Sequence, residues 1–348
     1  MNIAFVTSEF VTEKNKGGQA TYIANIATIL SEKGHNIYIV TASDCSEDIV
    51  WKDKVYVCRV EYTEEFAALK GVPLVYGILN WIWFTFGMAG VLRRRLMELS
   101  KEVKLDIVQY SNLRGITALK PVIKNSIVRL SNHQGAWRMA SKEFFDINDA
   151  NLKLKLHERI WLYSLKNYKK IFAPSWVVAK LTSEYINRNV DIIESPVSIN
   201  VDYEKPAFWD NLLEGKKYYL FFGTMNYIKG IHTVCKAAEL FLDKYPDRYI
   251  VLLGPNSNKL PLDDNHVDSY GLMEHLVVRH KENIIFMESI YNKKWLNYIL
   301  REAIACLMPS RIDNFPNTCV EAMANGAIVF GTNGASFEQL IVDGENGF

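Results

Sequence analysis

The chain has 348 residues, of which 49% are hydrophobic and 23% are charged. This composition is ordinary for a soluble globular protein, and the length predicts two domains because one hydrophobic core rarely organises so many residues. The 40 basic and 39 acidic side chains leave a net charge of +1. That balance argues against a dedicated nucleic-acid binder, which would carry a strong basic excess.

The cysteines and the N-terminus indicate a reducing, cytoplasmic location. The five cysteines are odd in number and no two have C-x-x-C spacing, whereas disulfide frameworks use paired cysteines. Cys235, Cys306 and Cys319 lie among apolar residues and are expected to fill the core. No basic region precedes the apolar run at residues 2–7, so this run is expected to form a strand and not a signal peptide.

The first half of the chain alternates between predicted strands and helices. The apolar run 2–7 predicts a buried parallel strand. After a loop that ends at Gly17-Gly18, apolar residues take helical spacing as far as Gly34, which suits a helix end. Further strands are predicted at residues 37–40, 106–110, 126–130 and 170–173, and a long helix with a basic side at 151–169.

Residues 71–92 are the nearest approach to a membrane segment. Their number is close to the ~20 apolar residues that a spanning helix needs. However, Asn80, Thr85 and four glycines interrupt the stretch, and three arginines follow it at 93–95. We interpret it as a core helix. The alternative is a helix that lies on a membrane surface with its arginines on lipid head groups.

A second set of alternating elements begins near residue 218. The run 218–222 predicts a strand that ends at Gly223, and a loop carrying Lys229-Gly230 leads into a helix from about residue 231 to 245. Further strands are predicted at 249–253, 283–287, 303–308 and 327–330. Alternation of this kind predicts an α/β protein with parallel sheets and helices on both faces.

The segment 195–202 is interpreted as the join, which predicts two Rossmann-like domains at residues 1–200 and 201–348. Ligands bind beyond the C-terminal ends of the strands in such sheets. The candidate ligand loops are residues 8–18, 132–138, 223–230 and 310–318. Two domains that face each other would line a central cleft with all four loops.

The most specific motif is residues 309–326, P-S-R-I-D-N-F-P-N-T-C-V-E-A-M-A-N-G. A helix is predicted to start near Thr318, and the free N–H groups and dipole of a helix start attract a diphosphate. The carboxylates of Asp313 and Glu321 suit the binding of sugar hydroxyls. Residues 318–321 also have the T-x-x-E pattern of a capping box, which needs no ligand.

This motif resembles that of the retaining glycosyltransferases with the GT-B fold (carbohydrate-enzyme family 4). Those proteins carry an acidic residue, seven residues, a Glu and then Ala-Met-Ala-x-Gly. The resemblance implies that Asp313 contacts donor-sugar hydroxyls and that Glu321 holds the ribose. Asp313 stands where the family more often has Glu, which is one methylene longer. Further donor-binding positions implied in this loop are Arg311, Asn314, Phe315, Asn317 and Thr318.

A second match covers residues 223–230, where the family usually has Gly-Arg, four residues and Lys-Gly. The family's Arg and Lys neutralise the departing diphosphate together. Gly223 and Lys229 match, but Thr224 replaces the Arg. One cation is therefore missing where charge develops in the transition state. Either Arg311 substitutes for it or the leaving group is stabilised less. Without the resemblance, Lys229 would be an exposed loop lysine.

Three further positions match the family more weakly. Gly17-Gly18 resembles a pair that lets the backbone approach the donor phosphate, although glycine pairs are common in turns. His133 follows a predicted strand where the family often has a His-Gly-like turn at the reacting centre, and the alternative is a structural histidine. Glu338 matches a family Glu near the nucleotide pocket, and the alternative is a solvated acid in a first helical turn.

No metal and no cofactor are expected. The polar group Asp263, Asp264, His266 and Asp268 lacks a recognisable pattern of metal ligands and is interpreted as solvated. No G-x-G-x-x-G follows the first strand, which argues against a nicotinamide enzyme. The family also continues beyond the position of Phe348 with a C-terminal helix, so the sequence is expected to be shortened at this end.

The sequence therefore predicts a retaining, metal-independent glycosyltransferase of surface polysaccharide biosynthesis. The resemblance implies that a nucleotide-sugar such as a UDP- or GDP-sugar binds the C-terminal domain, and that a glycan or lipid-linked acceptor binds the N-terminal one. It also implies front-face attack, with the departing phosphate taking the acceptor proton. Two alternatives stay open: a GT-B-type nucleotide-sugar epimerase, and a non-catalytic nucleotide-sugar-binding subunit, which Thr224 and the missing tail favour. A peripheral position at the inner face of the membrane is the alternative to a freely cytoplasmic one.

Overall fold

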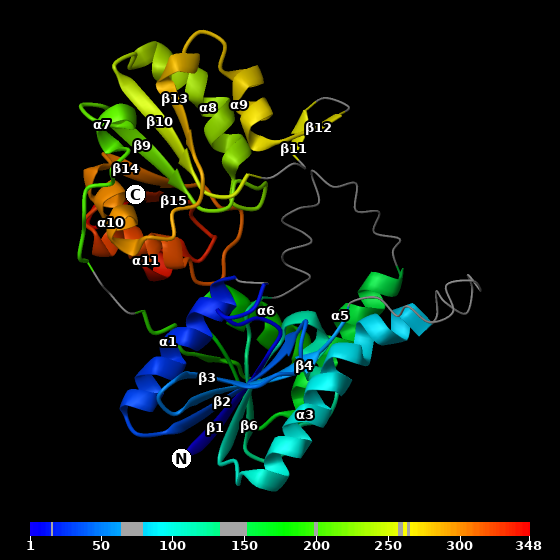
Figure 1. Cartoon of the computed structure of the whole chain (residues 1–348). Coiled ribbons are helices and arrows are strands. Elements are labelled where there is room, and N and C mark those ends of the chain that lie inside the picture. The colour runs from blue at the N-terminus through cyan, green and yellow to red at the C-terminus, as the bar shows by residue number, and fades with distance from the viewer. Residues whose placement is uncertain (15–16, 64–78, 133–151, 198–200, 257–259, 263–264) are drawn as a thin grey trace. The chain divides into compact units, whose positions relative to one another are not determined.

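The computed structural model describes residues 1–14, 17–63, 79–132, 152–197, 201–256, 260–262 and 265–348 (Figure 1). The chain divides into two compact units. Unit 1 is built from the described residues of Met1–Gly135 and Ile147–Val197, and unit 2 from those of Ser198–Phe348. Each is an α/β unit with a mainly parallel sheet, as the alternating pattern predicts.

Unit 1 contains an eight-stranded sheet with the order β3-β4-β2-β1-β5-β6-β7-β8. Neighbouring strands are parallel except for β3, which is antiparallel to β4. The strands are β1 (Asn2–Thr7), β2 (Asn36–Ser43), β3 (Ile49–Lys52), β4 (Val55–Glu61), β5 (Ile107–Ser111), β6 (Ser126–Arg129), β7 (Lys170–Ala173) and β8 (Asp191–Ile192). Every strand predicted in this half is therefore present.

The β3–β4 hairpin was not predicted from the sequence. Its turn contains Asp53 and Lys54, and Lys54 adopts a left-handed conformation with φ 57°. Glycine usually occupies such a position, and Asn-Gly or Asp-Gly is the strongest short-range signal for a hairpin. A lysine in its place removed the signal on which a sequence-based prediction depends.

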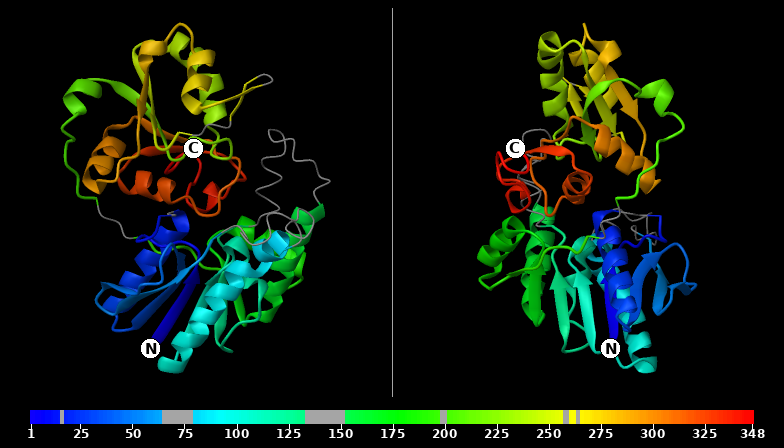
Figure 2. Two further views of the ribbon diagram at one scale, coloured as in Figure 1. Left: turned by 45° about the vertical axis from the view of Figure 1, so that its right-hand side comes forward. Right: turned by 90° about the vertical axis from the view of Figure 1, so that its left-hand side faces the viewer.

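Helices cover both faces of the unit 1 sheet (Figure 2). They are α1 (Gly18–Glu32), α3 (Met88–Glu102), α5 (Leu152–Ser164) and α6 (Trp176–Ile186), with short turns η1 (Trp83–Gly87), η2 (Leu113–Ala118) and η3 (Leu165–Asn167). Helix α1 buries Tyr22 and Ile23 against Ile3 and Phe5 of β1. Alternate residues of a strand point to opposite faces of the sheet. Ile3 and Phe5 are two residues apart, so both point to the face that α1 covers.

A buried polar network fixes the start of α1 against three strand ends. The Gln19 amide donates to Thr7 Oγ1 at 2.9 Å and its carbonyl accepts from Ser111 Oγ at 2.9 Å and Ser131 Oγ at 3.2 Å. Arg129 extends the network, with its guanidinium 3.8 Å from the centre of the Tyr22 ring. Burial lowers the pKa of Arg129 to about 10, so the side chain is charged at neutral pH.

The described part of the apolar segment 71–92 is helical, and its end is buried as the core-helix interpretation requires, whereas Ile82 and Phe84 are exposed. Leu92 and Leu96 of α3 are fully buried. Two of the arginines expected at lipid head groups are held by the protein instead: Arg93 Nε donates to the Lys120 carbonyl at 3.3 Å, and Arg95 pairs with Asp48. Among the described residues, no helix has both the length and the apolar character needed to cross a membrane.

Unit 2 contains a five-stranded, fully parallel sheet with the order β13-β10-β9-β14-β15. Its strands are β9 (Lys217–Phe222), β10 (Arg248–Leu253), β13 (Ile284–Met287), β14 (Ala305–Met308) and β15 (Ile328–Gly331). A small antiparallel hairpin joins β11 (Leu260–Leu262) and β12 (Asn265–Val267). The helices are α7 (Trp209–Leu212), α8 (Ile231–Lys244), α9 (Ser269–Leu276), α10 (Lys293–Glu302) and α11 (Asn317–Ala324), with short turns η4 (Lys281–Asn283) and η5 (Phe337–Gln339).

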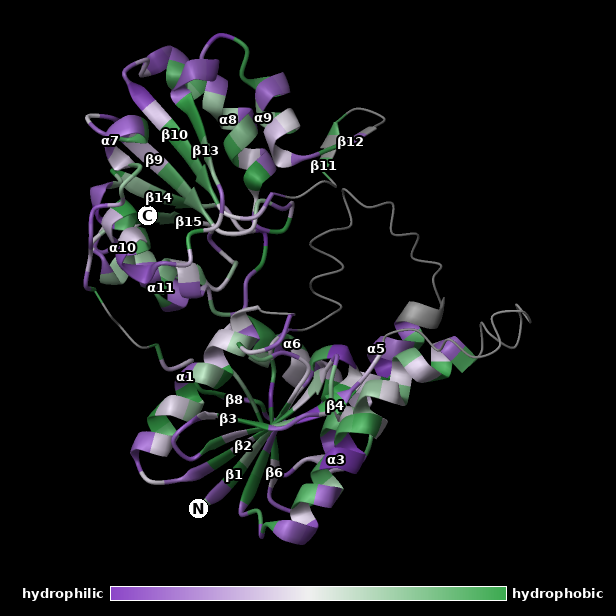
Figure 3. Cartoon of the chain, viewed as in Figure 1, coloured by the Kyte–Doolittle hydropathy of each residue, from purple (hydrophilic) through white to green (hydrophobic). Residues whose placement is uncertain are grey.

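Two hydrophobic clusters occupy the two faces of this sheet. Helices α8 and α9 pack on one face, and α7, α10 and α11 pack on the other. Strand β9 contributes Phe221 to the first cluster and Tyr218 and Leu220 to the second. Figure 3 shows the strands as mainly hydrophobic and the helices as two-sided. The three cysteines predicted to fill this core, Cys235, Cys306 and Cys319, are buried and free.

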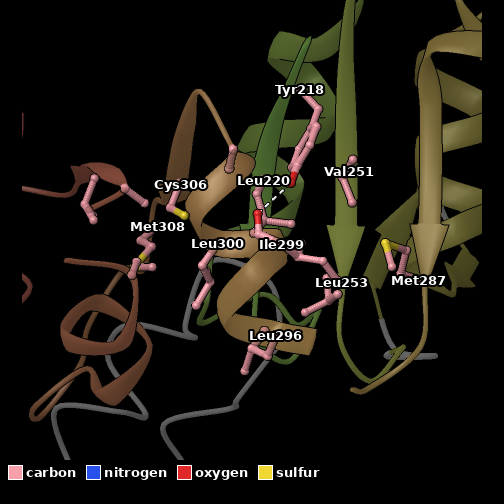
Figure 4. Packing of buried hydrophobic residues seen from close by; sticks show 14 of the residues in the cluster. Tyr218, Leu220, Val251, Leu253, Met287, Leu296, Ile299, Leu300, Cys306 and Met308 are labelled. Carbon is pink, nitrogen blue, oxygen red and sulfur yellow. Dashed lines mark hydrogen bonds between the residues drawn. The ribbon is translucent and has the colours of Figure 1, made fainter. Parts of the chain in front are cut away.

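Tyr218 completes the C-terminal end of α10 inside the second cluster (Figure 4). The last four carbonyls of a helix lack partners within the helix. Ile299 belongs to this last turn, is fully buried, and accepts a hydrogen bond of 2.5 Å from the Tyr218 hydroxyl. The phenol therefore satisfies a carbonyl that water cannot reach.

Replacing Tyr218 by Phe is expected to lower the free energy of unfolding by about 1–3 kcal/mol, because the Ile299 carbonyl would remain buried without a donor. Tyr219→Phe is the matched control. No described residue forms a hydrogen bond with its hydroxyl, and its ring packs on Phe241 with centroids 5.0 Å apart. Guanidinium unfolding of both variants measures the difference, and equal losses would contradict this role of Tyr218.

Candidate functional site

Two loops of unit 2 bring the predicted donor-binding residues together. Strands β9 and β14 are parallel neighbours, with Leu220 opposite Cys306. Their following loops, 223–230 and 309–316, therefore leave the same edge of the sheet. This is the edge at which parallel α/β sheets bind ligands.

The two loops touch through their backbones at Gly230. This residue has φ +78°, and a Cβ atom there would lie 1.8 Å from the carbonyl oxygen of Pro309. Next to this contact, the Arg311 backbone N–H donates to the Ile228 carbonyl at 2.8 Å. Only glycine permits this approach, so the Lys-Gly pair of the sequence motif has a packing role in addition to any role in binding.

Lys229 and Asp313, from the two different loops, form an ion pair with Nζ–Oδ2 2.5 Å. Asp313 is only 9% exposed. Its second oxygen, Oδ1, accepts the Asn314 backbone N–H at 3.0 Å. The Asn226 side chain accepts the Lys229 backbone N–H at 2.9 Å and so fixes the turn. Lys229 is therefore not a free surface lysine but the partner of the predicted acidic site residue.

Arg311 supplies a second cation beside the same turn. Its guanidinium lies 4.8 Å from the centre of the Tyr227 ring, within the usual distance for a cation–π contact. Thr224, which occupies the expected Arg position, is exposed. Loop 223–230 therefore lacks the expected arginine, but loop 309–316 supplies a cation, Arg311, beside it.

Helix α11 starts at Asn317 without a side-chain cap. The amides of Cys319 and Val320 bond to the Pro316 carbonyl, whereas those of Asn317 and Thr318 donate to no group in the described part of the chain. The methyl of Thr318 would lie 3.8 Å from a Cβ at Gly223. Two free N–H groups therefore meet the first loop at the positive end of the helix dipole.

The capping-box alternative for residues 318–321 is wrong. Thr318 Oγ1 has only the sulfur of Met308 at 4.0 Å. Glu321 instead pairs with Lys293 at the start of α10. Sequence reasoning missed Lys293 because it lies 28 residues away and belongs to no motif.

The segment around Glu338 is tied to the same site by a residue that was not predicted. Ser336 is fully buried with φ 71°, and its hydroxyl donates to the Asp313 carbonyl at 2.8 Å. Glu338 itself is exposed in the first turn of η5 and accepts the Gly334 N–H. This geometry matches the alternative interpretation, in which Glu338 is a solvated acid in a first helical turn. A role of Glu338 in nucleotide binding stays a prediction.

The predicted residues of unit 1 are described less completely. Gly17 caps α1, and a Cβ there would lie 2.8 Å from the carboxylate of Glu9. Gly17 therefore lies against the end of the Glu9 side chain, a contact that sequence reasoning missed. Burial raises the pKa of Glu9, against the opposing charge of Arg114. His133 lies outside the described residues.

The remaining predicted donor-site residues, Gly223, Asn314, Phe315 and Thr318, lie in the two contacting loops or at the start of α11. Burial raises the pKa of Cys319 on α11 to about 12, so its thiol is protonated at neutral pH and is not a ready nucleophile.

The acidic group near residue 268 has a local structural role. Asp268 caps α9, with Oδ1 accepting the Gly271 N–H at 2.7 Å. Asp263 and Asp264 lie outside the described residues. Within the described ranges, no three histidine, cysteine, aspartate or glutamate side chains are grouped to hold a metal ion.

Gly230→Ala is expected to destabilise the protein by more than about 4 kcal/mol, because the new methyl would clash with the Pro309 backbone. Gly215→Ala is the control, since Gly215 has φ +70° but nothing within 4 Å of the added Cβ. It is expected to cost roughly 1–2 kcal/mol for the left-handed backbone alone. Chemical denaturation compares the two, and similar losses would show that the loop contact is unimportant.

Comparisons with known proteins agree with this geometry. The model of the family "Glycosyl transferases group 1" matches residues 204–348. A D-inositol 3-phosphate glycosyltransferase of Arthrobacter sp. (strain FB24) is 28% identical over 178 residues, 49% of this chain and 40% of the relative. Spore coat protein SA of Bacillus subtilis (strain 168) is 25% identical over 140 residues, 39% of this chain and 35% of the relative. The matches thus span less than half of either relative.

Solved structures share the fold at low sequence identity. Sucrose-phosphate synthase from Thermosynechococcus elongatus superposes with a TM-score of 0.73 at 14% identity, covering 100% of this chain and 85% of that one. WaaG, a glycosyltransferase involved in lipopolysaccharide biosynthesis, has a TM-score of 0.64 at 15% identity and covers 98% and 84%. The two-sheet architecture is that of the GT-B glycosyltransferases. Through residues 204–348, the chain is similar to the glycosyl transferases group 1 family.

Proposed function

We propose that the protein is a retaining glycosyltransferase that takes a sugar from a nucleotide-sugar bound by unit 2. The observation that carries the proposal is the Lys229–Asp313 pair beside the uncapped start of α11. A cation, a carboxylate and two free backbone N–H groups converge there from loops at one sheet edge. A nucleoside diphosphate-sugar has the matching groups, namely phosphate oxygens and sugar hydroxyls.

The donor chemistry follows from these groups. Lys229, Arg311 and the N–H groups of α11 stabilise the diphosphate as its negative charge grows during departure. Asp313 accepts hydrogen bonds from the donor-sugar hydroxyls, and Glu321 accepts those of the ribose. Arg311 takes the part of the arginine that Thr224 replaces. Two cations and a helix start neutralise the leaving group, so the proposed reaction requires no metal ion and no cofactor.

The sugar is transferred to a hydroxyl of a glycan or lipid-linked acceptor in surface polysaccharide biosynthesis. Support for this acceptor comes from WaaG, a glycosyltransferase of similar fold that is involved in lipopolysaccharide biosynthesis. The acceptor attacks on the face from which the diphosphate leaves, and a phosphate oxygen takes its proton. The enzyme works in the cytoplasm, where nucleotide-sugars are its donors.

Titration calorimetry with UDP and GDP in the presence of EDTA tests the donor site. We expect wild-type protein to bind one of the two nucleotides, and Glu321→Gln to raise the Kd at least ~10-fold, or ~1.4 kcal/mol. Lys293→Met is the control, because it breaks the same Lys293–Glu321 ion pair by removing the exposed lysine and leaves the Glu321 carboxylate in place. It is expected to change the Kd little, since surface pairs contribute about 0–1 kcal/mol.

Equal weakening by both variants would mean that the ion pair supports the fold and that Glu321 contacts no ribose. Turnover separates the alternative functions. Release of nucleotide from a donor only when an acceptor is present identifies a transferase, and release without an acceptor identifies a nucleotide-sugar epimerase. Binding without any release identifies a non-catalytic subunit.

A peripheral contact with the inner membrane surface is part of the proposal for unit 1. Ile82 and Phe84 are 44% and 48% exposed, and Phe84 contacts Trp161 of α5 with ring centroids 5.8 Å apart. Helix α5 exposes Tyr163, with Lys166 5.0 Å from its ring centre. Exposed apolar side chains combined with cations are typical of surfaces that bind anionic lipids.

Co-sedimentation with anionic vesicles at low salt tests this contact. Ile82→Ser combined with Phe84→Ser is expected to remove most of the bound fraction. Leu240→Ser is the control, because Leu240 is 74% exposed on α8 of unit 2. Absence of wild-type binding to the vesicles would disprove the membrane contact.

A further inference from the structure

Arg129, the last residue of β6, is a buried cation without an acidic partner. It is 7% exposed, and its guanidinium lies 3.8 Å from the centre of the Tyr22 ring. Burial lowers the pKa of Arg129, and among the described residues Tyr22 is the one ionisable group that opposes this change. Burying an ion is costly unless an opposite charge compensates it. Arg129 therefore lacks the counter-ion that a buried guanidinium requires.

The same guanidinium has a hydrogen-bond donor that no described residue uses. Its two terminal nitrogens donate to Ser131 Oγ at 3.2 Å and to Ser195 Oγ at 2.8 Å. Its third nitrogen, Nε, is buried and finds no acceptor in the described part of the chain. Nearly all buried polar atoms have a partner, and an unpaired one in a folded protein calls for a bound water or ion.

The hydrogen bonds around Arg129 run in a direction that leaves a further donor over. Thr7 Oγ1 donates to the Glu9 carbonyl at 2.9 Å, so it accepts the bond from the Gln19 amide nitrogen. The Gln19 carbonyl then accepts from Ser111 and Ser131. An amide nitrogen carries two hydrogens, so one N–H of Gln19 remains after its bond to Thr7.

These donors line a small cavity whose walls come from α1 and from the strands β1, β5 and β6. Arg129, Gln19, Gln109 and Tyr22 supply polar groups, and Val6 is among the apolar ones. Gln109 donates one of its two amide hydrogens to the Tyr22 hydroxyl at 3.3 Å. The cavity volume is about 10 Å³, close to the minimum for one water-sized occupant. A sugar, a phosphate or a sulfate is too large for it.

We propose that this cavity binds one chloride ion, which accepts hydrogen bonds from Arg129 Nε and from the amide nitrogens of Gln19 and Gln109. Chloride accepts hydrogen bonds, donates none and carries the charge that Arg129 lacks. Water suits the site less well, because it adds no charge and its own two hydrogens need acceptors. The proposal goes beyond the proposed function and does not depend on it.

A chloride ion in this place ties the start of α1 to the sheet. Gln19 lies in the first turn of α1, directly after the Gly17-Gly18 pair, whereas Gln109 belongs to β5 and Arg129 to β6. An ion that binds the folded chain and not the unfolded one stabilises the folded state. The stability of the protein is therefore expected to depend on chloride itself, and not on ionic strength alone.

Thermal unfolding of the full chain in sodium chloride and in sodium gluconate, at equal ionic strength, tests the proposal. Gluconate is too large for the cavity. The measured quantity is the melting temperature in chloride minus that in gluconate, compared between wild type and Arg129→Met. We expect this difference to be about 2 °C or more larger in wild type and to saturate as the chloride concentration rises. The same difference in both proteins overturns the proposal.

Two features make Arg129→Met a suitable variant with a matched control. Replacing a buried charge by an apolar side chain of similar length is often neutral for stability, so the variant is expected to fold. Arg301→Met is the control, because Arg301 also stacks on a tyrosine, Tyr203, at 4.6 Å but is exposed on α10. The control is expected to keep the wild-type difference, and its loss in both variants overturns the proposal.

Crystals of the wild-type chain grown in sodium bromide locate the ion without any variant. Bromide is a halide like chloride, and its anomalous scattering distinguishes it from water. We expect an anomalous peak in the cavity beside Arg129 Nε. A water molecule in the cavity, or bromide bound only at other places, overturns the proposal.

Discussion

The backbone contact between Gly230 and Pro309 is the constraint on which the proposed donor site of unit 2 depends. A Cβ atom at residue 230 would lie 1.8 Å from the Pro309 carbonyl oxygen, so the two loops can meet only because that atom is absent. The residue before this glycine is Lys229, and four residues after Pro309 comes Asp313. The ion pair between them is therefore a consequence of how closely two neighbouring strand ends approach.

The electrostatics of this region follow from the same packing. Parallel strands that end at one edge deliver their loops to one place, and a short helix that begins there without a cap leaves two N–H groups free. Positive potential from these groups adds to that of Lys229 and Arg311. Because Glu321 pairs with Lys293 and not with its own helix start, the carboxylate does not neutralise the site in which an anion is proposed to bind.

In unit 1, buried polar side chains hold the ends of the strands in position. Gln19 links three of them, and Arg129 is charged among these groups with an aromatic ring beneath it.

The class of fold, most of the strands and the two loops of the proposed donor site could be predicted from the sequence, because periodic apolar runs and a dense motif are local properties. The sequence also favoured a core helix for the apolar segment 71–92, and the end of that segment lies in α3, which buries Leu92. Only the tertiary structure decided that Glu321 pairs with Lys293, that Ser336 bonds to Asp313, and that Glu9 lies against Gly17. These contacts join residues far apart in the sequence, and no local pattern records them. The same holds for the β3–β4 hairpin, whose turn uses Lys54 where the recognised signal is glycine.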